Sequence, residues 1–224
     1  MTTILHIETA TKVCSVALSV DGELTQLQEL KDDGYAHGEQ LTILIQQVLD
    51  LQGITSEELS AVSVSAGPGS YTGLRIGVST AKGLCYALGI PLIAVNTLES
   101  MAAIGKIKYP ALNLCPMIDA RRMEVFSLIA SAQSEIVKAV SADVLDEYSY
   151  TDFEPFVCFG DGAAKMQELW ANRPITFDPD LEPSASGQIS IAYQKYLKQE
   201  FEDVAYFEPD YLKEFYQAPA SKKN

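Results

Sequence analysis

Residues 65–84 read SAGPGSYTGLRIGVSTAKGL, a run of small residues followed by a Gly-Pro-Gly turn and a helical segment. Gly73, Gly77 and Ala81 recur every four residues, which leaves one helix face nearly without side chains, so that another backbone can approach it closely. Backbone N–H groups at a helix start also favour anions, and the glycines equally suit a tight strand-to-helix connection. No lysine follows at the spacing of a Walker P-loop, which excludes that motif. A partner contact, an anion site and a structural connection remain as interpretations.

The sequence on either side of this stretch predicts alternating strands and helices. An Asp21-Gly22 turn between two alternating apolar segments favours a β-hairpin, and apolar residues at helical spacing favour a helix after it. Three antiparallel strands therefore come first, as a meander, ahead of a loop at 31–38. The expected order is β-β-β-α-β-α-β, with strands at 4–8, 14–20, 23–30, 61–67 and 91–96 and helices at 39–51 and 72–88.

A similar order returns after about residue 110, which predicts two topologically related α/β halves with a cleft between them. Glu8 ends the first strand of one half, and Asp119 ends the first strand of the other. The segment AAIGKIKYP at 102–110 is the expected boundary, so we place the halves at 1–104 and 105–224, with the last segment packing back on the first half. The second half is expected to contain strands at 112–118, 123–130 and 135–140, a strand, Gly-Asp-Gly turn and helix within 155–170, a long loop at 171–187 and a helix at 187–200.

Composition limits the class of protein. A formal net charge of −14 and a sequence pI of about 4.5 oppose broad contact with nucleic acid, because lysine and arginine drive phosphate binding. No apolar run approaches the ~20 residues that cross a bilayer, and the first residues lack the basic region of a secretory peptide, so we expect a cytoplasmic protein. The four scattered cysteines, without a C-x-x-C pair, predict buried thiols rather than zinc ligands.

Four motifs carry a resemblance to a known family. They are IETAT at 7–11, GPGSYTGLRIG at 67–77, IDARRMEVF at 118–126 and EPDYLKEF at 208–215, and together they span almost the whole chain. Two halves that each open with a three-stranded meander resemble the actin-like, Hsp70-like and sugar-kinase-like ATPase superfamily. Within it, the motifs resemble the bacterial tRNA threonylcarbamoyladenosine biosynthesis protein family TsaB, also called YeaZ.

The resemblance implies a non-catalytic role. TsaB family members are companions of TsaD, the homologous subunit that transfers the threonylcarbamoyl group to adenosine 37 of tRNA, and TsaE is the ATPase of the set. The resemblance therefore implies that the chain forms a heterodimer with TsaD and a homodimer when it is alone. It also implies that the chain contacts tRNA only through the complex and does not contact a membrane. An ATPase or phosphotransferase of the same superfamily and an M22-type glycopeptidase remain the alternatives.

The segment NTLESM at 96–101 argues against a metal centre. The resemblance implies that TsaD-type sites hold a metal with two histidines in an N-H-x-E-x-H segment, whose i, i+4 spacing puts both imidazoles on one helical face. Thr97 and Met101 replace that pair, and neither suits a divalent ion in an oxygen and nitrogen site. We therefore expect no metal. His6 is expected to be a core or strand residue, and His37 a solvated loop residue.

The resemblance also implies a nucleotide cleft, which this sequence preserves incompletely. Active relatives usually carry an aspartate after the first strand to orient water on the nucleotide's magnesium, whereas Glu8 is one methylene longer and disturbs near-octahedral geometry. We expect no tightly bound cofactor, and weak binding of ATP or ADP stays open. The residues of this vestigial cleft would be Glu8, Thr9, Thr11, Asp119, Gly160 and Asp161.

The resemblance places the partner contact on the first two helices, through which TsaB family members form a four-helix bundle with TsaD or with a second copy. Ile43 and Leu51 lie off the main apolar stripe of the helix at 39–51 and give it more apolar surface than one buried face needs. Packing within one protomer is the rival explanation for many of these positions. The candidate interface residues are Leu41, Ile43, Leu44, Gln47, Val48, Leu51, Gly73, Leu74, Gly77, Val78 and Ala81.

Overall fold

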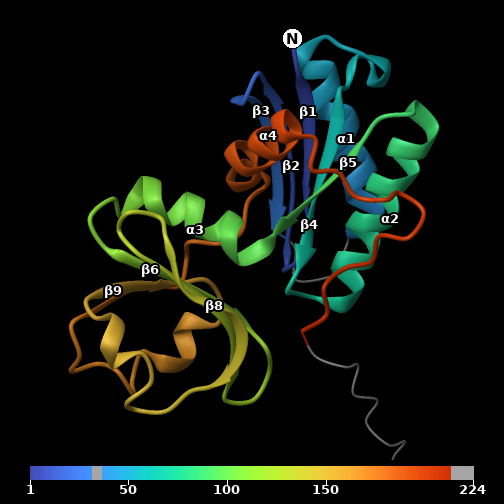
Figure 1. The fold of residues 1–224 in the computed structure, drawn as a ribbon. Helices are drawn as coiled ribbons and strands as arrows, with labels where there is room; N and C mark the ends of the chain where they lie inside the picture. The colour runs from blue at the N-terminus through green and yellow to red at the C-terminus, as the bar shows by residue number, and fades with distance from the viewer. Residues whose placement is uncertain (32–36, 213–224) are drawn as a thin grey trace, which may run out of the picture.

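The computed structural model describes residues 1–31 and 37–212. Residues 32–36 of the expected loop, the side chain of His37 and the last three residues of the EPDYLKEF motif lie outside the described residues, and so does the expectation that His37 is solvated. Two five-stranded mixed sheets form the two halves of the molecule, joined through the helix α3 (Thr97–Lys108) (Figure 1). The predicted fold class of two topologically related α/β halves is confirmed.

The first sheet has the strand order β3-β2-β1-β4-β5. The antiparallel meander of its first three strands follows the Asp21-Gly22 turn, and β4 and β5 run parallel to β1. Parallel neighbours need a crossover, which α2 (Tyr71–Leu88) supplies between β4 and β5. The strands are β1 (Thr3–Glu8), β2 (Val13–Val20), β3 (Glu23–Lys31), β4 (Ala61–Gly67) and β5 (Leu92–Asn96).

The second sheet repeats this order as β10-β9-β6-β7-β8, with β6 in the place of β1. Its first three strands are again an antiparallel meander, β9 runs parallel to β6, and β10 runs parallel to β9. The repeat puts Glu8 and Asp119 at equivalent strand ends. The strands are β6 (Asn113–Asp119), β7 (Glu124–Ala130), β8 (Ile136–Val144), β9 (Phe156–Phe159) and β10 (Ile175–Asp178).

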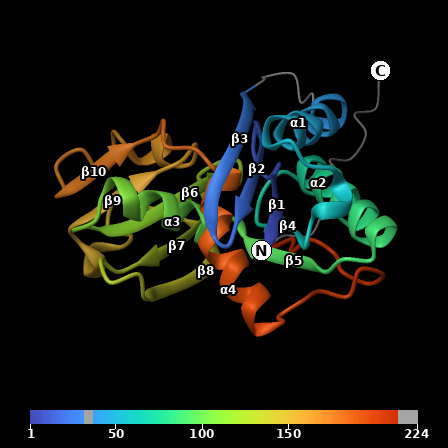
Figure 2. The ribbon, with the colours of Figure 1, turned by 90° about the horizontal axis from the view of Figure 1, so that it is seen from above.

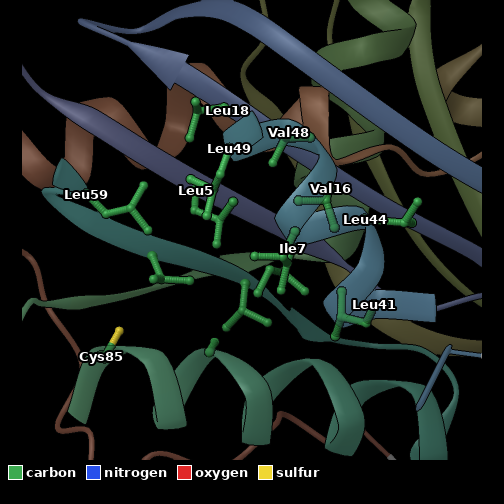
Figure 3. Packing of buried hydrophobic residues seen from close by; sticks show 14 of the residues in the cluster. Leu5, Ile7, Val16, Leu18, Leu41, Leu44, Val48, Leu49, Leu59 and Cys85 are labelled. Atoms are coloured by element: carbon green, nitrogen blue, oxygen red, sulfur yellow. The ribbon is translucent and has the colours of Figure 1, made fainter. Parts of the chain in front are cut away.

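Helices cover both faces of the first sheet. The helices α1 (His37–Gln52) and α2 lie side by side on one face, and α4 (Ile189–Lys198) lies on the other (Figure 2). Leu5 of β1 packs with Val48 of α1 in the core beneath α1 and α2 (Figure 3), whereas its neighbour Ile4 packs against Ala192 of α4. This alternation is the two-residue period of a strand that is buried on both faces. The last helix of the chain therefore packs on the first sheet.

The expected boundary at 102–110 is wrong, because most of that segment belongs to α3. Asn96 caps this helix, since its side chain accepts hydrogen bonds from two backbone N–H groups of the first turn at 2.9 and 3.2 Å. Gly105 lets the helix pack closely on the ring of Phe159 in β9. A boundary between the two halves at residues 104 and 105 would therefore divide a helix that packs on the second sheet.

Two further expectations about the second half are corrected. The chain after the Gly-Asp-Gly turn forms only the short 3-10 helix η3 (Ala163–Met166) and turns, not an α-helix. The expected loop at 171–187 contains β10 and part of the 3-10 helix η4 (Ala185–Gln188). The four-residue strand β10 exists because it pairs with β9, a long-range contact that local sequence does not reveal. Two other 3-10 helices are η1 (Ser56–Glu58) and η2 (Thr151–Phe153).

The environments of the four cysteines and the lengths of the helices can be compared with the expectations from composition. Cys14, Cys85, Cys115 and Cys158 are free and buried, as predicted. Cys85 lies in the core between α2 and the first sheet (Figure 3). Within residues 1–31 and 37–212, every helix is too short or too polar to cross a membrane.

Candidate functional site

The glycine-rich loop joins the end of β4 to α2 and packs on the loop between β1 and β2. Ser70 caps α2, and its side chain accepts a hydrogen bond from the backbone N of Gly73 at 3.3 Å. The backbone N of Ser70 donates to the carbonyl oxygen of Ala10 at 2.6 Å, and Thr9 Oγ1 donates to the Gly73 carbonyl at 2.8 Å. The chain itself thus bonds the start of α2, which favours the structural connection over an anion site.

The small-residue face of Gly73, Gly77 and Ala81 points into the protein's own interior. A Cβ atom at Gly73 would overlap the carbonyl oxygen of Thr9, and a Cβ atom at Gly77 would overlap Thr9 Oγ1. Ala81 is fully buried in the core that α1 and α2 share with the first sheet. The prediction that this stripe contacts a partner is wrong, because the backbone that approaches it belongs to the β1–β2 loop.

Most of the other candidate interface residues also lie in the core. They form the apolar stripes that α1 and α2 turn toward the first sheet, so the prediction that they contact a partner is wrong for them as well. These residues, each at most 6% exposed, are Leu41, Leu44, Val48, Leu74 and Val78.

The remaining three candidates lie on the outer face of α1. Ile43 is 47% exposed and Leu51 is 58% exposed, and Gln47 is exposed between them. Their spacing of four residues places all three along one side of the helix. This side of α1 therefore presents apolar surface to solvent in the described chain.

The outer face of α2 carries a second row of small residues. Ser79, Gly83 and Ala87 are exposed at a spacing of four, and a Cβ atom at Gly83 would meet nothing within 4 Å. The neighbouring Tyr86 is 86% exposed. Sequence reasoning missed this row, although its spacing equals that of the buried stripe. The two rows differ only in which one turns toward the sheet.

Glu8, at the end of β1, is fully buried. Its Oε1 accepts hydrogen bonds from the backbone N of Ala10 at 2.7 Å and from Ser65 Oγ at 3.0 Å, and its Oε2 has no partner among the described residues. Burial raises the pKa of Glu8 to about 7, and the hydrogen bonds to its charged form oppose the rise. The carboxyl group is thus held inside the first half.

A cleft of about 1110 Å³ lies between the two halves. Asp119 Oδ1 accepts a hydrogen bond from Lys165 Nζ at 2.6 Å, so a cation already neutralises the carboxylate at the end of β6. Asp161 Oδ1 accepts a hydrogen bond from the backbone N of Asp119 at 2.8 Å. Of the residues expected in a nucleotide cleft, Thr11, Asp119 and Asp161 line it, whereas Glu8, Thr9 and Gly160 are buried away from its lining, which corrects their predicted place.

Gln188 of η4 ties the last helix to the first sheet, and sequence reasoning missed it. Its Nε2 donates to the carbonyl oxygen of Ile7 at 2.8 Å, and its Oε1 accepts from Ser63 Oγ at 2.7 Å. The same Ser63 hydroxyl lies 2.7 Å from His6 Nδ1, and Ser19 Oγ lies 2.7 Å from His6 Nε2. Burial lowers the pKa of His6 to about 3. His6 is therefore a core residue with both ring nitrogens bonded, as expected, while no spacing pattern marks a lone glutamine.

A sequence model of the family described as TsaD, tRNA N6-adenosine threonylcarbamoyltransferase, matches residues 31–220. The chain belongs to the TsaD family. It is 28% identical to the tRNA threonylcarbamoyladenosine biosynthesis protein TsaB of Haemophilus influenzae over 94% of this chain and 93% of that protein, and 29% identical to TsaB of Escherichia coli over 94% of each. YeaZ from Pseudomonas aeruginosa has a TM-score of 0.80 and 28% identity, covering 95% of this chain and 100% of that one. The resemblance to TsaB that the motifs indicate is confirmed.

In this member of the TsaD family, core packing fills the position of the expected histidine pair. Thr97 is fully buried and Met101 is 1% exposed. Met101 packs in the core of the second sheet, next to Gly160, where an added Cβ atom would meet its terminal methyl group. Clusters of three or more histidine, cysteine, aspartate or glutamate side chains that could hold a metal ion are absent from residues 1–31 and 37–212.

Proposed function

We propose that this chain is the non-catalytic partner subunit of a TsaD-type transferase in the synthesis of N6-threonylcarbamoyladenosine in tRNA. The observation that carries the proposal is the packing of NTLESM, where Thr97 and Met101 take the positions of the histidine pair and are buried. A catalytic metal needs protein ligands and an open position for water or substrate, and a buried hydroxyl with a thioether supplies neither. Similarity to TsaB over nearly the whole chain supports the same role.

The hydrogen bonds and ion pair of the two strand-end carboxylates, Glu8 and Asp119, support the proposal that the chain does not hydrolyse ATP. Orienting water on a magnesium-bound nucleotide requires a free carboxylate that faces the cleft. The carboxyl group of Glu8 accepts hydrogen bonds from the backbone N of Ala10 and from Ser65 Oγ of β4 inside the first half, and Asp119 is paired with Lys165 at 2.6 Å. Phosphate release from ATP by the purified chain should therefore stay at the level of the buffer, and sustained turnover would favour the ATPase alternative.

We propose that the partner contact lies on the outer faces of α1 and α2. Ile43 and Leu51 present apolar surface on α1, and the row of Ser79, Gly83 and Ala87 lets a second helix approach α2 closely. Burial of apolar surface, worth about 25 cal/mol per Å², would stabilise the contact. The same surface would join two copies of this chain when TsaD is absent. TsaE would then join the larger assembly.

The charge of the chain assigns tRNA binding to the complex rather than to this subunit. A net charge of −14 repels a polyanion, and binding to phosphates depends on lysine and arginine. We place the assembly in the cytoplasm, where tRNA would be modified. Binding of tRNA by this chain alone should be weak and should fall further as salt rises.

Reconstitution tests the proposed role directly. The chain is mixed with TsaD, TsaE, a tRNA transcript and TsaC, the family's supplier of the activated threonylcarbamoyl intermediate, all from the same organism. The modified nucleoside is measured by mass spectrometry with each protein left out in turn. Omission of this chain should abolish modification, and omission of TsaD should do the same. Modification without TsaD would refute a non-catalytic role, and full modification without this chain would refute any role.

A matched pair of variants tests the contact surface. Leu51→Asp puts a charge on the outer face of α1, and Val144→Asp makes the same kind of change on β8, where Val144 is 75% exposed. Co-elution with TsaD on size-exclusion chromatography should be lost for Leu51→Asp and kept for Val144→Asp. If Leu51→Asp still co-elutes with TsaD, the contact lies elsewhere on the chain.

A further inference from the structure

Two consecutive arginines form the turn between β6 and β7. Arg121 has φ 69° and Arg122 has φ 54°, so the backbone of both residues is in the left-handed conformation that residues other than glycine rarely adopt. The turn is closed by hydrogen bonds from the backbone N of Ala120 to the carbonyl of Glu124 and from the N of Glu124 to the carbonyl of Arg121. Glycine and asparagine take the left-handed conformation most readily, so a loop with two such positions favours those residues. Two arginines here are a costly choice for the fold and point to a use for their side chains.

Both side chains are exposed and line the cleft between the halves. Neither guanidinium group forms a hydrogen bond or an ion pair with another residue of the described chain. The carboxylate of Asp119, two residues before Arg121, already accepts hydrogen bonds from Lys165 and from the backbone N of Arg121. Each guanidinium thus keeps five N–H donors in a planar fork that suits a carboxylate or a phosphate.

The rest of the cleft lining distinguishes between these two anions. Apolar and aromatic side chains lie beside the charges, among them Ile118 and Leu212, and the tilted rings of Tyr71 and Tyr211 contact each other with centroids 4.9 Å apart. A polyanion such as RNA would be repelled by the net charge of −14 along its whole length, whereas a single carboxylate brings only one charge to the arginine end of the cleft. The carboxylates that line the cleft are Asp119, Glu124, Asp161 and Asp210. A protein segment with one acidic side chain among apolar ones matches this mixture better than a nucleic acid does.

We propose that Arg121 and Arg122 bind the carboxylate of an acidic segment of a partner protein, which docks in the cleft between the two halves. The inference rests on the proposed role as a partner subunit, and it adds a second contact away from α1 and α2. Paired arginines bind a carboxylate through charge-assisted hydrogen bonds, which are stronger and more directional than neutral ones.

The test removes the guanidinium groups while it relieves the turn. The double variant Arg121→Asn with Arg122→Gly puts residues that tolerate left-handed backbone at both positions, so its melting temperature should be equal to or above that of the wild type. Its affinity for TsaD, measured by calorimetry with TsaD alone and with TsaD plus TsaE, should fall about tenfold or more. Loss of affinity in a protein that is at least as stable excludes misfolding as the cause. The variant Arg121→Lys with Arg122→Lys, which keeps the charges but loses the fork, should fall between the two.

The outcomes separate this inference from the proposed function. If the wild type binds neither TsaD nor the pair of proteins, the proposed function fails and the inference fails with it. In a second outcome, TsaD binds the wild type but not Leu51→Asp, and it binds the double variant Arg121→Asn with Arg122→Gly, here called the Asn-Gly variant, as tightly as the wild type. The proposed function then stands, and the two arginines are solvated surface residues. If the Asn-Gly variant keeps its affinity for both proteins but loses affinity for a tRNA transcript in a filter-binding assay, the site binds RNA and the proposal is overturned.

Discussion

The substitution Glu8→Gln measures how much the ionisation of a buried carboxyl group lowers the unfolding free energy. Oε1 of Glu8 accepts hydrogen bonds from the backbone N of Ala10 and from Ser65 Oγ, and a glutamine Oε1 can accept both. Oε2 has no partner among the described residues, so the amide nitrogen that replaces it breaks no hydrogen bond of the described chain. The variant therefore keeps the shape and the acceptor of the wild type but cannot ionise.

The rise in the pKa of Glu8 from 4.5 to about 7 fixes the expected magnitude. At about 1.4 kcal/mol per pKa unit, folding with an ionised Glu8 costs about 3 kcal/mol. Because the pKa is raised in the folded state, this cost is absent below about pH 4.5, grows as the pH rises and is complete above about pH 7. Between pH 5.5 and pH 8 the wild type should lose about 2 kcal/mol of unfolding free energy that Glu8→Gln does not lose.

Urea denaturation of dilute protein at several pH values between 5.5 and 8.5 measures this difference. The lowered pKa of His6 acts in the opposite direction, because the unfolded histidine binds a proton near pH 6 that the buried one refuses. That contribution is present in both proteins and drops out of their difference. Glu168→Gln, a change of the same kind at an exposed residue, is the control and should follow the wild type. Parallel curves for the wild type and Glu8→Gln would show that Glu8 is not buried as described.

Four further substitutions test the packing. Gly77→Ala should lower the unfolding free energy by about 1–3 kcal/mol, because its Cβ atom would overlap Thr9 Oγ1. Gly83→Ala places its Cβ atom in open space and should raise the unfolding free energy by up to about 1 kcal/mol. Equal effects of the two variants in urea denaturation would contradict the assigned faces of α2. Met101→Ala should cost about 2–5 kcal/mol by leaving a cavity and should not change the metal content by elemental analysis, while a measurable loss of bound metal would reopen the metal site. Gln188→Ala removes the buried hydrogen bonds to the Ile7 carbonyl and from Ser63 Oγ. It should cost about 1–3 kcal/mol in thermal or urea unfolding, and an unchanged midpoint would show that Gln188 does not stabilise the contact between α4 and the first sheet.

Local signals explain how much of the fold could be predicted. The Asp21-Gly22 turn lies between alternating apolar residues, and both features act within a few residues, so the meander β1–β3 is confirmed. The apolar spacing between 39 and 51 persists over three turns, so α1 is confirmed with ends that differ by one or two residues. By contrast, β10 has four residues and depends on a strand that lies about twenty residues earlier in the chain.

The face of α2 could not be assigned from the sequence, because spacing alone does not say what covers a smooth face. Gly73 and Gly77 mark one smooth face, and Gly83 marks another, all at the spacing of a helix. The close approach of Thr9 to the first face depends on the loop between β1 and β2, more than sixty residues away in the sequence. A small-residue row therefore predicts a close backbone contact, and tertiary structure decides whether the partner is the same chain or another.

The two strand-end carboxylates show how a repeated fold can mislead about chemistry. Glu8 and Asp119 end equivalent strands, which predicts equivalent roles at one cleft. Their surroundings differ, because the first carboxyl group is buried in its own half, while the second faces the cleft but is paired with Lys165. Neither then adds a free negative charge to the cleft. The arginine pair at 121–122 is consequently less opposed by its neighbours than the net charge of −14 indicates, so a single carboxylate that arrives from outside gains most at that end of the cleft.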